Sequence, residues 1–337
     1  MKKRTKKLLS IALAFGLAVG PARAHTLQVG PGQGYDSPSA ALKEAADGDT
    51  VEIAPGEYFD CVRVRAANLT IRGTGPGAVL TDQVCDGKAI IVAQADNLTV
   101  RDLTLQRARV ADGNGAGIRA EGRNISIEHV QFRNSQSGLM AGDNPDSTIT
   151  VRDSTFRETG ICEGDKCGNS ISIGHVARLI IERTDITGNR GGHQIVSGAD
   201  LTELRHDTLQ DGPTGSASFQ LMLPHGGTLV MEDCAVEKGP HATNLRAAIL
   251  LDGHATAPMT FRRNNYIDDT GTAVPFILDW SDGTPVLDRN TIPASDSEIS
   301  TAGALAHHLR DTLSTMKAQA RGMAGSTLRG LKSLLGH

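Results

Sequence analysis

Aromatic residues are scarce in this chain: Phe, Trp and Tyr make up 3% of its 337 residues, and there is a single Trp. After residue 24, no apolar run approaches the length that a membrane-spanning helix needs. Glycine, in contrast, is abundant, with 38 residues. This composition favours many short strands joined by tight turns over a helical bundle or a doubly wound α/β fold.

The chain also lacks the short motifs of several enzyme classes. We find no Walker loop, no dinucleotide-binding glycine fingerprint, no serine nucleophile elbow and no HExxH helix. Any chemistry must therefore come from residues that are distant in the sequence and are brought together by the fold.

The first 24 residues predict a signal peptide. A basic stretch, Lys2–Lys7, precedes an apolar run, Leu8–Val19, that is too short to span a bilayer, and cleavage is expected after Ala24. An uncleaved anchor helix is the alternative. Removing this segment leaves 28 Lys and Arg against 38 Asp and Glu, a net charge of about −10. We expect a periplasmic or secreted protein with no transmembrane segment after cleavage and no general affinity for nucleic acid.

The five cysteines are interpreted as disulfide candidates, because an exported protein folds in an oxidising compartment. Cys61 and Cys85 lie about one repeat apart, and Cys162 and Cys167 would close a small loop. A metal site is the alternative, but neither pair is a CxxC and no second ligand pair follows at zinc spacing. Cys234 remains, and its place in a strand pattern predicts a buried thiol.

An apolar residue, four mostly polar residues and a second apolar residue form a hexad that recurs every 23 to 30 residues or so. Between hexads lies another short strand pattern with alternation of period two. Asn264 and Asn290 fall at hexad bends, where we expect a stack of side chains that satisfies buried backbone groups. The hexads are Val100–Leu105, Ile127–Phe132, Val151–Phe156, Ile181–Ile186, Leu204–Leu209, Met231–Val236, Phe261–Tyr266 and Leu287–Ile292.

A period of this length predicts a solenoid whose coils bury their apolar residues only by stacking. We therefore predict an all-β fold, a right-handed parallel β-helix of about nine coils over residues 25–300. A short helix over Ser37–Ala46, with a Ser N-cap and a Pro in its first turn, would cap the N-terminal end. Residues 301–337 carry Leu305, Leu309 and Leu313 at helical spacing opposite a basic face. This amphipathic tail would pack on the last coils, or bind a partner or a membrane surface.

Two regions resemble known β-helix proteins. The segment Tyr35–Tyr58 resembles the N-terminal cap of pectate-lyase-like β-helices and pectin esterases. Gly168–Gly174, Gly192–Ala199 and Gly215–Gly227 are similar to a group of secreted bacterial right-handed parallel β-helix repeat proteins, a branch of the pectate-lyase-like superfold. The resemblance implies the fold and a carbohydrate ligand.

The chain departs from that family at most of its polar positions. The family pattern has His and Tyr where this chain has Asn169 and Ser172, Lys where it has Val196, and Asp where it has Met222. Gly198 similarly replaces an Arg. The pattern's His is kept as His193, so the resemblance implies that most of a polar cluster has been lost.

Candidate site residues concentrate between Gly168 and Asp279. His193 is the first choice for a catalytic group, since its ring titrates near neutrality, although a histidine that only fills a turn would look the same. Asp252 and Asp279 end strands of adjacent coils and could form a small acidic site, which would admit Ca²⁺ as a cofactor, or they could be solvated turn residues. The predicted substrate-binding residues are Asn169, His175, Ser197, Gln220, His225 and His254.

Three functions remain open from the sequence. The first is an exported β-helix that binds or acts on a polysaccharide or cell-envelope glycan, as a lyase-like or epimerase-like enzyme if it is catalytic. The second is a non-catalytic glycan-binding or structural envelope solenoid. The third is a protein that acts through its tail, with the solenoid as a spacer. The first rests on analogy of fold.

Overall fold

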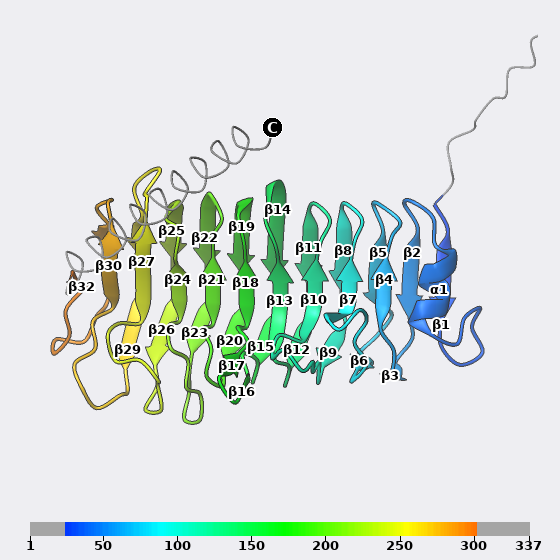
Figure 1. Ribbon diagram of the computed structural model, residues 1–337, viewed down its shortest axis with the longest axis horizontal. Helices are drawn as coiled ribbons and strands as arrows, with labels where there is room; N and C mark the ends of the chain where they lie inside the picture. Colours follow the sequence, from blue (N-terminus) through cyan, green and yellow to red (C-terminus); the bar gives the residue numbers. More distant parts are fainter. Residues whose placement is uncertain (1–23, 302–337) are drawn as a thin grey trace, which may run out of the picture.

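The computed structural model describes residues 24–301 and shows a right-handed parallel β-helix of about ten coils (Figure 1). Nearly all regular structure is strand, so the predicted fold class is confirmed and the expected nine coils fall close to the number found. The predicted signal peptide, but for its last residue, and all but the first residue of the predicted helical tail lie outside the described residues. No described helix is long and apolar enough to cross a membrane.

Three parallel sheets, here called A, B and C, run the length of the solenoid, and each coil passes through them in the order C, A, B. Sheet A comprises β1 (Thr26–Val29), β2 (Thr50–Ile53), β5 (Thr70–Gly73), β8 (Leu98–Arg101), β11 (Ile125–Glu128), β14 (Asn144–Arg152), β19 (Val176–Glu182), β22 (Leu201–Arg205), β25 (Thr228–Glu232), β28 (Thr260–Arg262) and β31 (Val286–Asp288). Sheet B comprises β3 (Gly56–Tyr58), β6 (Ala78–Thr81), β9 (Thr104–Gln106), β12 (Gln131–Arg133), β15 (Thr155–Arg157), β20 (Asp185–Thr187), β23 (Thr208–Gln210), β26 (Ala235–Lys238) and β29 (Asn265–Asp268). Sheet C comprises β4 (Val62–Val64), β7 (Ala89–Ala93), β10 (Ala116–Ala120), β13 (Ser137–Ala141), β18 (Ile171–Ile173), β21 (Ile195–Ser197), β24 (Leu221–Leu223), β27 (Ile249–Gly253), β30 (Ile277–Ser281) and β32 (Ile299–Ser300).

A short helix, α1 (Pro38–Glu44), covers the N-terminal end of the solenoid (Figure 1). The Ser37 side chain accepts a hydrogen bond from the Ala40 N–H, and Pro38 occupies the first turn, where a missing N–H costs nothing. Ala41 and Leu42 are buried against the first strands. The predicted cap is therefore confirmed.

The interior is filled by like residues stacked on like residues, because each inward position of one coil faces the same position of the next. Phe132 and Phe156, which close successive hexads, stack with ring centroids 4.3 Å apart. Such aromatic pairs add to the free energy gained from apolar burial. Leu105 precedes them in the same column, and Ile186 follows.

Each hexad is two short strands, one in sheet A and one in sheet B, joined by a sharp bend. The third hexad residue takes a left-handed backbone conformation, which Asp, Asn and His adopt more readily than most residues do. Its φ lies between +49° and +58° in Asp102, His129, Asp153, Arg183, His206, Asp233, Arg263 and Arg289.

The fourth hexad residue points into the bend, and its side chain satisfies a backbone N–H of the neighbouring coil. The Asn264 Oδ1 accepts from the Cys234 N–H at 3.0 Å, and the Asn290 Oδ1 accepts from the Asn264 N–H at 3.0 Å. The expected asparagine stack is therefore present, and it continues into other polar residues. From the centre to the C-terminal end, this bend column reads Ser154, Thr184, Asp207, Cys234, Asn264 and Asn290.

Asp207 is the ionisable carboxyl of the bend column. It is 1% exposed, and its two oxygens accept from the N–H groups of Thr184, at 2.9 Å, and Arg205, at 3.0 Å. Burial outweighs these hydrogen bonds and raises the pKa of Asp207 to about 8. The carboxyl is therefore largely protonated at neutral pH in the folded protein.

The cysteines pair as expected. Cys61 and Cys85 are joined with their Cα atoms 5.5 Å apart, and Cys162 is joined to Cys167 across the hairpin of β16 (Cys162–Glu163) and β17 (Lys166–Cys167). Cys234 is free and buried in the bend column, where burial raises the pKa of its thiol. Two disulfides are compatible with an extracellular or periplasmic protein.

Replacing Asp207 by Asn tests the bend column. In the folded state the pKa of Asp207 is about 8, against 3.8 for the model carboxyl, so the wild type loses stability as the pH rises through this interval. The variant has no proton to lose there. We expect the free energy of unfolding of Asp207→Asn to gain on the wild type by up to ~1.4 kcal/mol per pH unit between these values.

Denaturant unfolding at a series of pH values measures the difference. The control is Asp153→Asn, a bend position whose carboxylate is paired with Arg183 and has a lowered pKa. A difference between Asp207→Asn and wild type that stays constant from pH 4 to pH 8 would contradict the assignment.

Candidate functional site

A groove follows the turns that connect sheet C to sheet A in the C-terminal half of the solenoid. One hollow of about 450 Å³ is lined by Asp143, His175, Asp200, His225 and His254. A second, of about 250 Å³, adjoins it at Asp143. These residues come from five successive turns, β13–β14 through β27–β28, so the groove runs along the axis of the solenoid. We call this surface the turn groove.

Glycines keep the floor of the turn groove low. A Cβ on Gly174 would lie 2.5 Å from the Asp143 Oδ1, and a Cβ on Gly226 would lie 1.9 Å from the His254 carbonyl oxygen. Gly226 also has a φ of +82°, which other residues rarely adopt. The turns therefore stack closely with no side chain between them, which leaves the polar side chains standing along the groove.

Two histidine–aspartate pairs link successive turns. The His175 Nε2 lies 2.9 Å from the Asp200 Oδ1, and the His254 Nδ1 lies 2.5 Å from the Asp282 Oδ2. The Ala255 N–H, and after it His254, hold the pKa of Asp282 below its usual value. All four side chains are more than half exposed. Imidazole and carboxylate groups in this arrangement can donate and accept hydrogen bonds from the hydroxyls of a ligand.

The outer face of sheet C, beside the groove, is apolar in these coils. Ser172, Val196 and Met222 lie side by side on adjacent strands, followed by Leu250 and Leu278. The first three are the positions at which the resemblance implied polar residues. No acid–base side chain replaces them on this row in the part of the chain that the structure describes.

His193 lies at the other edge of sheet C, where the chain arrives from sheet B. Its Nδ1 accepts from the Phe219 N–H at 3.2 Å, and the two rings stack at 5.6 Å. Burial, and then the charge of Lys238, lower its pKa to about 4. The Asn169 Oδ1 accepts from the His193 N–H at 2.8 Å. These two predicted site residues therefore bind the backbone of this turn and lie apart from the turn groove.

Two predicted ligand-binding residues are wrong, because both are buried in the interior. Ser197 is 0% exposed, and its hydroxyl is 2.7 Å from that of Thr202. Gln220 is 0% exposed, and its Nε2 donates to the Asp211 Oδ2 at 2.9 Å.

The acidic site expected from Asp252 and Asp279 is also wrong. The strand register pairs Asp252 with Trp280 and Asp279 with Leu251, so the two carboxylates lie on opposite faces of sheet C. Asp252 faces outward, whereas Asp279 is 8% exposed and accepts from the Ser281 N–H. The two residues cannot share one Ca²⁺ ion. Within residues 24–301, no three His, Cys, Asp or Glu side chains gather in a metal-binding arrangement.

A buried polar cluster that the sequence analysis missed holds the turn between β23 and β24. Lys238 is 0% exposed, and its Nζ donates to the carbonyl oxygens of Ala217, at 3.4 Å, and Ser218. Asp211 accepts from the Gly239 N–H at 3.1 Å and from Gln220. Burial lowers the pKa of Lys238 to about 8 and raises that of Asp211. The cluster fixes a long turn and opens onto none of the hollows described above.

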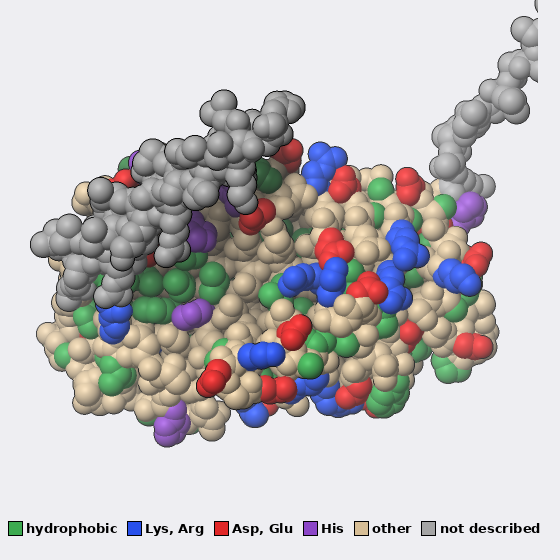
Figure 2. All heavy atoms as spheres, in the orientation of Figure 1, with side chains coloured by type: hydrophobic (Ala, Val, Ile, Leu, Met, Phe, Trp, Pro, Cys, Tyr) green, Lys and Arg blue, Asp and Glu red, His purple; other side chains and the backbone are tan. Residues whose placement is uncertain are grey.

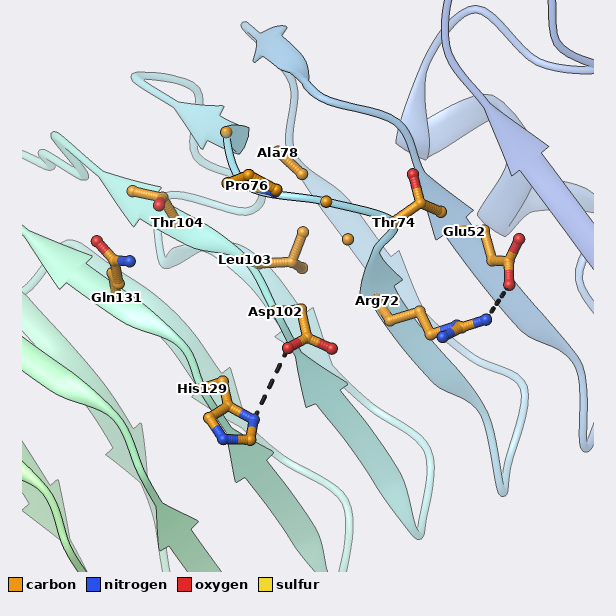
Figure 3. Close-up of a pocket in the computed structure, with 13 residues that line it drawn as sticks. Glu52, Arg72, Thr74, Pro76, Ala78, Asp102, Leu103, Thr104, His129 and Gln131 are labelled. Atoms are coloured by element: carbon orange, nitrogen blue, oxygen red, sulfur yellow. Dashed lines mark hydrogen bonds and ion pairs between the residues drawn. The ribbon is translucent and has the colours of Figure 1, made fainter.

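A further hollow, of about 610 Å³, lies at the bends between sheets A and B near the N-terminal end (Figure 3). Arg72 is paired with Glu52 there, and the His129 Nδ1 is 3.7 Å from the Asp102 Oδ1. It forms because the bend over residues 74–77 is longer than the hexad bends, and its polar lining is already paired. The turn groove, which crosses more coils, is the better candidate.

Comparison with known proteins supports the fold. No protein-family model matches the chain, and no curated protein sequence is similar to it. The structure is similar to that of the pectin methylesterase from Aspergillus niger, in its deglycosylated form, with a TM-score of 0.53 and 12% identity over 84% of this chain and 91% of the enzyme. The penultimately deglycosylated form of that enzyme gives a TM-score of 0.50 and 12% identity over 82% and 92%. At this identity the likeness concerns the fold alone.

The groove aspartates had a usable signal in the sequence. Asp200 follows His175 by one coil length, and Asp282 follows His254 in the same way. An aspartate and a histidine at the same turn position of adjacent coils must come into contact, because coils stack at one strand spacing. The partners of Lys238, in contrast, belong to a turn whose length differs from its neighbours, so no periodicity reveals them.

Substituting His193 tests its placement. Its folded-state pKa of about 4 lies below the model value of 6.5, so the unfolded chain binds a proton more readily between these values. The wild type therefore loses stability as the pH falls from about 6.5 to about 4. In His193→Gln this contribution is removed, and we expect a shallower acid dependence of the free energy of unfolding.

Histidine NMR titration of the wild type gives an independent measurement. The resonance that disappears in His193→Gln should titrate near pH 4. A midpoint above pH 6 would mean that the ring is open to solvent and available for proton transfer, contrary to this placement.

Proposed function

We propose that this protein is exported and binds a polysaccharide in the turn groove without cleaving it. The observation that carries the proposal is the groove itself: a hollow of about 450 Å³ that continues into one of about 250 Å³ across successive coils, with exposed imidazoles and carboxylates along it. A linear groove with repeated hydrogen-bonding groups fits a polymer of repeated hydroxyl-bearing units. Export is supported by the signal-peptide pattern and by the two disulfides.

The charges along the groove favour a neutral glycan over a uronate polymer. Its lining carries the carboxylates of Glu121, Asp143 and Asp200 against one guanidinium, that of Arg119. With neutral histidines this leaves the groove negative, and the mature chain as a whole is acidic. A polymer of uronate groups would be repelled.

The apolar outer face of sheet C supports binding without cleavage. The positions that carry polar groups in the proteins that the sequence resembles are Ser172, Val196 and Met222 here, and none of these can act as a base. The His175–Asp200 pair favours a second candidate, a lyase-like or epimerase-like reaction with His175 as the base.

Calorimetric titration of the mature protein with neutral and uronate oligosaccharides tests the proposal. We expect binding of a neutral glycan, and a loss of about tenfold in affinity in His175→Ala and in His225→Ala, since a hydrogen bond to a ligand is worth about 1 kcal/mol or more. His241→Ala, which removes an exposed histidine outside the groove lining, is the matched control.

Incubation of the same polymers with the protein separates the two candidates. Release of unsaturated products, seen by ultraviolet absorbance and lost in His175→Ala, would establish the lyase-like reaction and overturn the non-catalytic proposal. Equal affinity of wild type and both histidine variants would show that the ligand does not bind in the turn groove.

A further inference from the structure

The outer face of sheet C carries an apolar row in its C-terminal coils. Val196, Met222, Leu250 and Leu278 face outward in register on β21, β24, β27 and β30. With Phe219, Ala247 and Trp280, the last three form an apolar cluster separate from the core. We call these seven residues the sheet C patch. Figure 2 shows hydrophobic side chains gathered over this part of the face, and charged ones over the N-terminal half.

Other outward rows of the same coils are charged. On sheet A, Arg205 is paired with Glu232, and Arg262 is 3.5 Å from Glu232. Arg178 and Glu203 form a further pair on this sheet, at 2.5 Å. An apolar row is therefore a particular feature of sheet C and indicates a surface that another apolar surface covers.

The chain leaves the described region at the edge of this face. The last strand, β32 (Ile299–Ser300), pairs with β30, so the segment 302–337 begins beside Leu278. Four strand steps separate β32 from β21 in sheet C, a distance of roughly 19 Å. A helix covers that distance with about 13 residues.

The sequence of this segment matches what the patch requires. Leu305, Leu309, Leu313, Met316, Ala320 and Met323 recur at helical spacing and form one apolar stripe. The stripe extends over 19 residues, which exceeds the length needed. Arg310, Lys317 and Arg321 flank it, while Asp252 stands at the next outward position of β27 beyond Leu250.

We propose that residues 305–323 of the same chain bind the sheet C patch as an amphipathic helix. The stripe packs on Met222, Leu250, Leu278 and Trp280, and the basic side chains lie toward Asp252. Burying this apolar surface stabilises the C-terminal coils, whose last strand would otherwise lie at an open edge of the solenoid. The proposal does not depend on the glycan ligand of the turn groove.

Trp280 reports directly on this contact, because it is the single Trp of the chain. In the full-length mature protein, replacing Leu309 and Leu313 together by Asp should expose the indole, shift its fluorescence to longer wavelength and increase its quenching by iodide. The matched control replaces Ser314 and Ala318 by Asp, which adds the same charge on the opposite side of the predicted helix and should leave the fluorescence unchanged.

Trypsin cleavage after Arg310, Lys317 and Arg321 gives a second measurement from the other partner. Leu250→Asp should accelerate cleavage at these sites about tenfold or more, since a protease attacks the released segment. Val230→Asp, an outward apolar position on sheet A, is the control and should not. Circular dichroism verifies that both variants fold.

Two results would overturn the proposal. One is fluorescence of the Leu309→Asp, Leu313→Asp protein that matches wild type in wavelength and quenching. The other is a wild-type signal that changes on dilution, because the segment covering the patch would then come from a second copy or another molecule. Binding of wild type to lipid vesicles with an unchanged Trp280 signal supports the proposal, since the patch stays covered while the membrane is bound elsewhere.

Discussion

Stacking of one coil on the next is the constraint on which the rest of this structure depends. A single coil has no interior of its own, so its apolar side chains leave water only when a neighbouring coil lies about one strand spacing away. Residues at the same position of successive coils are therefore forced into contact. Phe132 lies on Phe156 inside the solenoid for this reason, and Asn264 on Asn290 in the bend column.

The same constraint organises the outside. Side chains of one kind form rows parallel to the axis: Arg and Glu alternate across sheet A, apolar residues cover part of sheet C, and histidines and aspartates follow the turns between the two. A site built in this way is long and shallow. The turn groove therefore suits an extended ligand that repeats along its length, and suits a small compact substrate poorly.

The sequence predicted those features that follow from a period. Hexad anchors located sheets A and B and the bend, and cysteines one coil apart proved to be joined. It failed where the outcome depends on a single residue of register. Asp252 and Asp279 are 27 positions apart, but the coils pair at a spacing of 28, so the two carboxylates fall on opposite faces. Gln220 fails for a related reason: it stands at the corner before β24, where the alternation of the strand does not apply.

The bend column distinguishes coils that the apolar hexad positions treat as equivalent. Valine, isoleucine, leucine and phenylalanine could exchange places there with little change in shape, and a coil displaced by one repeat would still bury them. In the column the occupants differ: a hydroxyl at Thr184, a carboxyl at Asp207, a thiol at Cys234 and an amide at Asn264. A displacement by one coil would put the thiol where the Thr184 N–H now has an oxygen acceptor, and sulfur accepts only weakly. The bend thus acts as an address for each coil, which selects the correct neighbour during folding among surfaces that are otherwise alike.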